Sequence, residues 1–304
     1  MPRFSVVIPC FNAEDTIGDT LDSLLAQTEG DWEALIIDDG STDDTRLIVA
    51  SMAGIDLRFR LMKNSGVGPS TARNMALAEA DGEIIAFLDA DDTWHPEKLE
   101  RLDAVFDDEE VDACFARVAM YQGKKRFGLS PEPEAKLTVD ALLSNDPVCT
   151  MSNVAIRLES FLSSGGFNTE MVHNADLEWM IRLVGDGANV IGLDEVLVNY
   201  LSSANGLSTD LEGMAAGRAL ALTSAARYGV LSDARAEAGY MRTLAGRALR
   251  LGAPGLQTLR LGLYCCAACP SGWFSNPFSG VRVLTGALLA SVLPRSLRCA
   301  LLSR

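Results

Sequence analysis

Acidic side chains gather directly after two apolar segments of the first ninety residues: Asp38 and Asp39 after the first, and Asp89, Asp91 and Asp92 after the second. Carboxylates that meet in a fold repel one another, so a cation or hydrogen-bond donors must balance them. Magnesium and manganese take carboxylate and phosphate oxygens together. The pattern therefore favours a site for a divalent cation and a diphosphate.

Not every acid of this region needs a role at such a site. Asp43, Asp44 and Asp92 suit loop or helix-cap positions, where acidic side chains are common. Asp39 and Asp91 are the stronger candidates, since each lies just beyond a buried segment.

Two further residue types fit a nucleotide-sugar ligand. Phe11 follows the first apolar run and offers a flat wall for a base, and Arg73 offers positive charge for a diphosphate. No GxGxxG follows the first apolar run, and no GxxxxGK[ST] occurs in the chain. A dinucleotide dehydrogenase and a P-loop NTPase therefore lose their main sequence argument.

The elements that must position these residues alternate between strands and helices. A continuous apolar, β-branched run predicts a buried strand at Phe4–Pro9, and further buried strands are expected at Leu35–Ile37 and Ile84–Leu88. Leu57–Met62 is a candidate for a strand between them. Helical patterns between them predict a helix from about Ile17, one capped by Ser41 or Thr42 and ending at Met52, and one over Ser70–Ala80. This alternation predicts an α/β fold with a doubly wound, mainly parallel sheet, which binds ligands beyond the carboxyl ends of its strands.

Three ordered blocks carry a family resemblance: FSVVIPCFNAEDTIGDTLDSLLAQT, LIIDDGSTDDT and GPSTARNMALAEADGEIIAFLDADDTWHPEKLE. Together they closely resemble the family 2 glycosyltransferases, which have the GT-A fold, over about residues 3–205. The ordered set is highly specific, whereas a lone DxD would be a weak signal. The resemblance implies a GT-A domain that transfers a sugar from a nucleotide donor.

The resemblance also implies roles for residues that hold the nucleotide. The positions of Pro9 and Phe11 flank the base in the family. The second aspartate of the IDDGS block, Asp39, accepts a hydrogen bond from uracil. Arg73 matches a position near the nucleotide phosphates or the sugar.

The LDADD block contains the family's DxD motif. By resemblance, Asp89 points toward the ribose or sugar, and Asp91 is the direct ligand of a Mg²⁺ or Mn²⁺ ion. Asp92 is a weaker candidate, because the residues after it read as the start of a helix.

The second half contains a candidate catalytic base. HNADLEWMIRL, residues His173–Leu183, has a helical apolar stripe that places Asp176 in the first turn. Alone, Asp176 reads as an ordinary helix-start acid. The family has a Glu-Asp pair here with the aspartate as base, and this chain keeps the aspartate but has Ala175 before it. The resemblance implies a single inverting displacement in which Asp176 deprotonates the acceptor.

Other positions of the second half depart from the family. Many relatives have Tyr-Arg and then a His before Ser, whereas this chain has Tyr200-Leu201 and then Asn205-Gly206-Leu207-Ser208. The Gln-x-x-Arg-Trp motif of processive synthases is absent, which favours transfer of one sugar per encounter. Earlier in this half, Val111–Ala116 and Ala119–Tyr121 read as two strands.

The net charge of −15 divides unevenly along the chain. Residues 1–210 carry 15 Lys and Arg against 38 Asp and Glu, whereas residues 211–304 carry 11 Arg against three acids. We therefore expect a GT-A domain over 1–210, with a nucleotide-binding half at 1–95 and an acceptor half at 96–210, and a basic helical C-terminal extension over 211–304. The acidic balance argues against a nucleic-acid partner.

The basic extension has two interpretations. Its arginines lie among leucine and aromatic residues, a composition typical of helices that lie on anionic membranes. It could instead be a helical bundle packed on the acidic domain. The lipid-linked acceptors of many family members favour membrane contact.

Targeting features are sparse. The start, MPRFSVVIPC, does not read as a secretory signal, and no window holds about 20 apolar residues. The seven cysteines form an odd, scattered set that fits a reducing compartment. We expect a cytoplasmic protein, with any peripheral contact on the cytoplasmic face of the membrane.

Together these features predict an inverting, metal-dependent hexosyltransferase. Its donor would be a nucleotide sugar, for which a UDP-sugar is favoured. Its acceptor would be a glycan or a lipid-linked acceptor in cell-surface polysaccharide biosynthesis. Two alternatives remain: a nucleotidyltransferase, which would not need Asp176, and a catalytically inactive scaffold that binds glycans or nucleotide sugars, which the altered Ala175 and Tyr200-Leu201 positions suggest.

Overall fold

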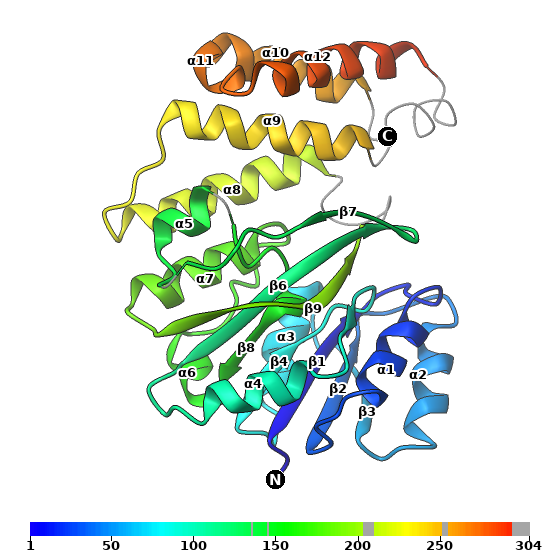
Figure 1. Cartoon of the computed structure of the whole chain (residues 1–304). Coiled ribbons are helices and arrows are strands. Elements are labelled where there is room, and N and C mark those ends of the chain that lie inside the picture. Colours follow the sequence, from blue (N-terminus) through cyan, green and yellow to red (C-terminus); the bar gives the residue numbers. More distant parts are fainter. Residues whose placement is uncertain (135, 145, 203–209, 251–254, 294–304) are drawn as a thin grey trace. The chain divides into compact units, whose positions relative to one another are not determined.

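A computed structural model of the protein describes residues 1–134, 136–144, 146–202, 210–250 and 255–293. The chain forms two compact units, Met1–Leu201 and Ser202–Arg304. The first is an α/β unit built on one sheet, and the second is helical over its described residues (Figure 1).

The sheet of the first unit runs in the order β3-β2-β1-β4-β8-β6-β9-β5, with β7 paired to β6. Its strands are β1 Phe4–Cys10, β2 Trp32–Asp38, β3 Phe59–Lys63, β4 Ile84–Phe87, β5 Thr93–Trp94, β6 Ala113–Gln122, β7 Lys125–Leu129, β8 Val154–Arg157 and β9 Val190–Leu201. The pairs β1–β2, β2–β3, β1–β4 and β6–β9 are parallel, and β8 joins the two halves by antiparallel pairing with β4 and β6. The prediction of an α/β fold with a mainly parallel sheet is confirmed.

Helices cover both faces of this sheet, as a doubly wound fold requires. Those of the first unit are α1 Ile17–Leu25, α2 Thr45–Ala53, α3 Pro69–Leu77, α4 Lys98–Phe106, α5 Val139–Ser144, α6 Leu158–Ser163 and α7 Ala175–Gly185, with a 3₁₀ turn, η1, at Met151–Asn153. Alternate residues of β1 and β4 share one core with α1, α2 and α4. On the other face, Phe87 of β4 packs its ring against those of Phe161, Phe167 and Trp179.

Three details of the predicted elements are corrected. Helix α2 begins at Thr45 with Asp44 at its N-cap, so Ser41 and Thr42 do not cap it. The two predicted strands after Val111 form a single strand, β6, with a register shift near its end. Strand β9 was not predicted, because Asp194 and Glu195 interrupt its apolar pattern.

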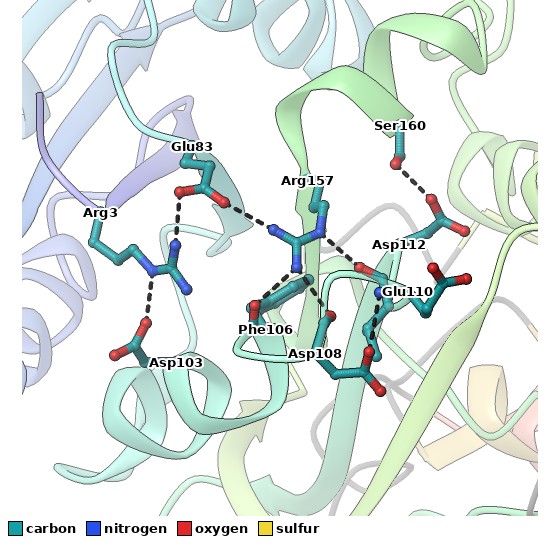
Figure 2. A network of polar contacts seen from close by, with 10 residues as sticks. Arg3, Glu83, Asp103, Phe106, Asp108, Glu110, Asp112, Arg157 and Ser160 are labelled. Carbon is teal, nitrogen blue, oxygen red and sulfur yellow. Dashed lines mark hydrogen bonds and ion pairs between the residues drawn. The ribbon is translucent and has the colours of Figure 1, made fainter.

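A buried arginine fixes the edge of the sheet where β4 begins. Figure 2 shows Arg157 of β8 donating to the Glu83 carboxylate and to three backbone carbonyls, those of Phe106, Asp108 and Val111. Arg3 binds the same Glu83 at 2.6 Å and also Asp103 of α4. These contacts join the first half of the sheet to α4 and β8 at the edge opposite to the acidic strand ends.

A lysine lies wholly inside the first unit, between α4 and η1. Lys98 is fully buried, its Nζ donates to the Asn153 carbonyl at 3.4 Å, and it lies 5.2 Å from the centre of the Trp94 ring. The Trp94 Nε1 in turn donates to the Ser152 carbonyl. Burial lowers the pKa of Lys98 to about 7.

The second unit is a stack of helices, which confirms the prediction of helical segments after residue 210. They are α8 Leu211–Ala226, α9 Ala234–Arg250, α10 Gly255–Ala268, α11 Pro270–Trp273 and α12 Pro277–Val292. Trp273 is fully buried in a core shared by α9, α10 and α12. Arg218 of α8 is also buried, 2.8 Å from Glu237 and 4.4 Å from the centre of the Tyr240 ring. Over the described residues, no helix combines the length and the hydrophobicity needed to cross a bilayer.

The buried lysine makes the stability of the first unit depend on pH. The unfolded chain holds the Lys98 proton up to about pH 10.5, whereas the folded chain releases it near pH 7, so the free energy of unfolding should rise between these values. Lys98→Met should remove that rise, which amounts to a few kcal/mol at about 1.4 kcal/mol per pH unit. Urea unfolding at several pH values checks this. The exposed Lys124→Met is the control, and a constant difference between Lys98→Met and wild type across pH would contradict the assignment.

Candidate active site

The predicted site residues follow strands that are neighbours in the sheet. Strand β1 pairs in parallel with β2 on one side and β4 on the other. The loops that carry Phe11, Asp39 and Asp89 therefore leave the sheet at the same edge, as the sequence predicted.

The loop after β1 is held by the loop after β2. Asn12 has a left-handed backbone with φ of 47°, its N–H donates to the Ser41 hydroxyl at 3.0 Å, and its side-chain oxygen accepts from the Thr42 N–H at 2.9 Å. Beside it, Phe11 is 59% exposed and Pro9 is half-buried. An exposed aromatic ring on a loop fixed in this way suits the wall of a base-binding site.

Asp39 is oriented by the loop that precedes α3. Its carboxylate accepts from the Asn64 side-chain amide at 2.6 Å and from the Gly68 N–H at 2.8 Å, one on each oxygen. Since each carboxylate oxygen has two lone pairs, both oxygens can accept another donor such as an imide N–H. Its neighbour Asp38 is buried and accepts from backbone N–H groups of its own turn, so Asp38 has a structural role.

Arg73 contacts a carboxylate of the DxD motif. Its guanidinium lies 2.5 Å from Asp89 and 5.5 Å from the centre of the Phe167 ring, and the residue is only 7% exposed. The Arg73 Nε is buried and has no hydrogen-bond partner in the described part of the chain. Arg73 thus offsets the charge of Asp89 and keeps one donor for another acceptor.

No such cation pairs with Asp91 in the part of the chain that the structure describes. It is half-buried, and burial together with the charge of Asp89 raises its pKa to about 6. A carboxylate in this position fits a hard divalent cation, which would relieve both costs. Among the described residues, no group of three or more His, Cys, Asp or Glu is placed to hold a metal. Asp91 therefore fits a metal that takes its remaining ligands from substrate phosphates and water, as Mg²⁺ commonly does.

Asp92 lies in a loop, as expected, but it is fully buried rather than an acid at the start of a helix, since α4 begins only at Lys98. Its carboxylate accepts from the Ser152 hydroxyl at 2.6 Å and from the Leu201 N–H at 2.9 Å. Burial and the charges of Asp91 and Asp89 raise its pKa well above the ordinary value. Asp92 therefore anchors the DxD loop to η1 and to the end of β9.

The Ser152 hydroxyl serves both ends of the DxD loop, because it also accepts from the Asp89 N–H at 2.9 Å. The hydroxyl of Thr150, two residues earlier, lies 3.3 Å from the Asp89 carboxylate and 3.4 Å from that of Asp92. Neither residue was predicted from the sequence, since no motif marks it.

Asp176 lies in the first turn of α7, as predicted. It is half-buried, and its carboxylate accepts from the N–H of Leu177. Ala175 is buried, so an acid at that position would have lost most of its hydration. Glu178 is buried as well and pairs with Arg182 at 3.0 Å.

The segment before α7 is attached to α3, the helix that carries Arg73. The Asn74 side chain forms two hydrogen bonds with the backbone of Phe167, at 2.8 and 2.9 Å, and the Ser70 hydroxyl donates to the Met171 carbonyl. Helix α3 thereby connects the segment that precedes Asp176 with the DxD loop, since Arg73 of the same helix pairs with Asp89.

The departure from the family near the end of the first unit lies partly within the described residues. Tyr200 and Leu201 end β9, and Leu201 binds Asp92 through its backbone N–H, a contact that does not depend on its side chain. Asn205-Gly206-Leu207-Ser208 lies outside the described residues.

The anchoring of the DxD loop can be tested through Ser152, which is fully buried. Ser152→Ala removes a donor to Asp92 and an acceptor from the Asp89 N–H, so it should lower the free energy of unfolding by about 1–3 kcal/mol. Ser163→Ala is the matched control, because that exposed hydroxyl donates to the Ser160 carbonyl of its own helix, α6. Its free energy of unfolding should stay within about 0.5 kcal/mol of wild type. Equal urea midpoints for the two variants would show that the Ser152 contacts do not stabilise the loop.

Solved structures support the fold assignment. The chain resembles TarS residues 1–349 of Staphylococcus aureus in complex with UDP-GlcNAc, with a TM-score of 0.58 and 17% identity, covering 96% of this chain and 93% of that one. It also resembles the mannosyltransferase PcManGT of Pyrobaculum calidifontis in complex with GDP-Man and Mn²⁺, with a TM-score of 0.58 and 21% identity, covering 99% of this chain and 84% of that one. At these identities the likeness concerns the fold alone.

Sequence relatives are closer. The UDP-Glc:alpha-D-GlcNAc-diphosphoundecaprenol beta-1,3-glucosyltransferase WfgD of Escherichia coli is 31% identical over 208 residues, 68% of this chain and 79% of WfgD. The putative teichuronic acid biosynthesis glycosyltransferase TuaG of Bacillus subtilis (strain 168) is 32% identical over 215 residues, 69% of this chain and 82% of TuaG. The profile of the family described as Glycosyl transferase family 2 matches residues 5–163. The chain therefore belongs to glycosyl transferase family 2 and is a glycosyltransferase with the GT-A fold.

Proposed function

We propose that this enzyme transfers a sugar from a UDP-sugar, with inversion, to a glycan or lipid-linked acceptor in cell-surface polysaccharide biosynthesis. One observation carries the proposal: Phe11, Asp39 and the Arg73–Asp89 pair lie on neighbouring strand ends and on α3. The same edge carries Asp91, a carboxylate for which no cation is found among the described residues. The donor complexes of TarS and PcManGT, which share the fold, and the UDP-Glc donor named for WfgD support a nucleotide-sugar site.

The donor would be held by residues at the ends of β1 and β2 and by a residue of α3. Phe11 and Pro9 would enclose the base, and Asp39 would accept the uracil imide N–H on lone pairs that Asn64 and Gly68 leave available. Arg73, whose guanidinium lies at Asp89, would offer its positive charge to the diphosphate or sugar.

Asp91 would hold Mg²⁺ or Mn²⁺ together with the diphosphate, and the bound ion would offset the negative charge that develops on the leaving group. PcManGT was solved with Mn²⁺, which supports a metal of this kind in the fold. Asp89, already paired with Arg73, would lie toward the ribose or sugar.

The acceptor would be activated by Asp176. Its carboxylate would accept the proton of the acceptor hydroxyl, whose oxygen attacks the anomeric carbon from the face opposite the diphosphate. The bond between that carbon and the diphosphate oxygen breaks in the same step, and the configuration inverts. One sugar would be added in each encounter.

Family membership argues against the nucleotidyltransferase alternative.

We propose that catalysis takes place in the cytoplasm, with residues 1–210 forming the catalytic domain and residues 211–304 the extension. The proposal of a lipid-linked acceptor rests on the diphosphoundecaprenol-linked GlcNAc that the name of WfgD gives as its substrate.

A donor screen tests the donor and metal assignments. With Mn²⁺ and membrane extract as acceptor, UDP-glucose or UDP-GlcNAc should release UDP, whereas GDP-mannose should release little GDP. Asp91→Asn should abolish the metal dependence of UDP binding in calorimetry, because an amide is a neutral and weaker ligand. Binding of no nucleotide sugar would refute the function, binding without turnover would favour an inactive scaffold, and unchanged metal dependence in Asp91→Asn would refute the metal ligand.

The catalytic base has its own test. Asp176→Asn should lower the rate of transfer about 100-fold or more, because general-base catalysis contributes about 10² to 10⁴, while the affinity for UDP-sugar stays unchanged. Asp19→Asn is the matched control, since Asp19 is also an aspartate in the first turn of a helix but is exposed on α1. A full transfer rate in Asp176→Asn would show that another group removes the proton.

A further inference from the structure

Helices α10 and α12 form a tightly packed antiparallel pair. A Cβ added at Gly255 would lie 2.3 Å from the Ala290 backbone, and one at Gly262 would lie 3.0 Å from the Leu284 side chain. Both helices also pack on α9 through a common core. The pair therefore has an inner side that faces α9 and an outer side that does not.

The outer side of the pair is apolar where a water-facing helix is normally polar. The buried residues of α12, including Val283, Ala287 and Ala290, recur at helical spacing. The opposite stripe of α12 and the exposed stripe of α10 carry large apolar side chains: Phe278, Val281, Leu288, Leu289 and Val292, and Leu256, Leu263 and Tyr264. Phe278 is 91% exposed and Val292 is 77% exposed. An exposed apolar face of this extent marks a contact surface.

Positive charge accompanies this face without an acid to balance it. Arg260 of α10 and Arg282 of α12 are both exposed within the two apolar stripes. At the end of α9, Arg250 lies within electrostatic range of Arg282 and Arg247, and burial together with these two charges lowers its pKa. No acidic residue occurs between residues 238 and 304.

We propose that the outer face of α10 and α12 binds an anionic lipid bilayer, with Phe278 and its apolar neighbours among the acyl chains and the arginines at headgroup phosphates. Interfacial helices combine an apolar stripe with flanking basic residues in this way. The inference rests on the proposed function, since an enzyme that uses a lipid-linked acceptor meets it at a membrane surface.

A second copy of the chain fits this face less well. A two-fold symmetric dimer places the same patch on both sides of the interface, so it would bring arginines against arginines. Anionic headgroups supply the opposite charge that the patch lacks.

Sedimentation with vesicles tests the proposal on the full chain. The protein should bind vesicles that contain phosphatidylglycerol and should bind pure phosphatidylcholine much more weakly. Arg260→Gln/Arg282→Gln should weaken binding to the anionic vesicles about fivefold for each arginine. Lys124→Gln/Arg126→Gln, which removes the same charge from an exposed hairpin of the first unit, should bind as wild type does.

The apolar contribution needs its own variants. Phe278→Ser/Leu289→Ser should weaken binding at least about tenfold. The control Ile55→Ser/Leu57→Ser, which removes two apolar side chains of the first unit that are 84% and 92% exposed, should have no effect. Unchanged urea midpoints would show that each variant folds.

Three outcomes would overturn the proposal. These are no sedimentation of wild type with anionic vesicles, equal losses in the control variants, and a dimer in light scattering that Phe278→Ser/Leu289→Ser dissociates while vesicle binding is absent. Release of UDP by hydrolysis of the donor in vesicle-free buffer separates the two proposals. If hydrolysis persists while vesicle binding fails, the membrane surface is wrong and the proposed function stands; if no variant or wild type turns over donor, the function itself fails.

Discussion

Repulsion among three carboxylates in the loop after β4 is the constraint on which the candidate site depends. Asp89, Asp91 and Asp92 lie within four residues of chain, and burial, together with the charges of Asp91 and Asp89, raises the pKa of Asp92. The fold compensates each carboxylate differently. Arg73 pairs with Asp89, and hydroxyl and amide donors from η1 and β9 bind Asp92. Within the described residues no ion pair is found for Asp91, and we propose that this carboxylate is the one that binds a metal ion.

This compensation explains why elements far from the nucleotide-binding half belong to the site. Helix α3 carries Arg73 to Asp89 and also holds the segment before α7 through Asn74 and Phe167. Turn η1 carries Ser152, and the buried Trp94 and Lys98 bind the backbone of that turn from behind. At the other edge of the sheet, Arg157 fixes the junction of β4 and β8. These contacts fix both ends of β4, the strand that precedes the DxD loop, and thereby hold the loop in place.

The sequence predicted those features that local pattern determines. Strands β1, β2 and β4 are buried on both faces, so their sequences are mainly apolar, and the helical period placed Asp176 in the first turn of α7. Features that depend on distant partners were not predictable. Ser41 and Thr42 read as helix caps but bind Asn12 of another loop, and the burial of Asp92 requires Ser152 and Leu201. Residue types alone suggested Phe11, Asp39 and Arg73 for a nucleotide-sugar site, whereas the expected role of Pro9 and the uracil contact of Asp39 came from the family resemblance.

The hydrogen bond between Asp92 and Leu201 also sets an order of assembly during translation. The two residues are separated by 109 positions, so at about 5 to 20 residues per second a ribosome needs roughly 5 to 20 s to deliver the amide after it has delivered the carboxylate. The parallel pairings of β1 with β2, of β2 with β3 and of β1 with β4 lie wholly within the first ninety residues and can form in that interval. The nascent chain therefore holds a sheet edge whose most buried acid still lacks one of its donors, and the DxD loop reaches its final form only when β9 emerges.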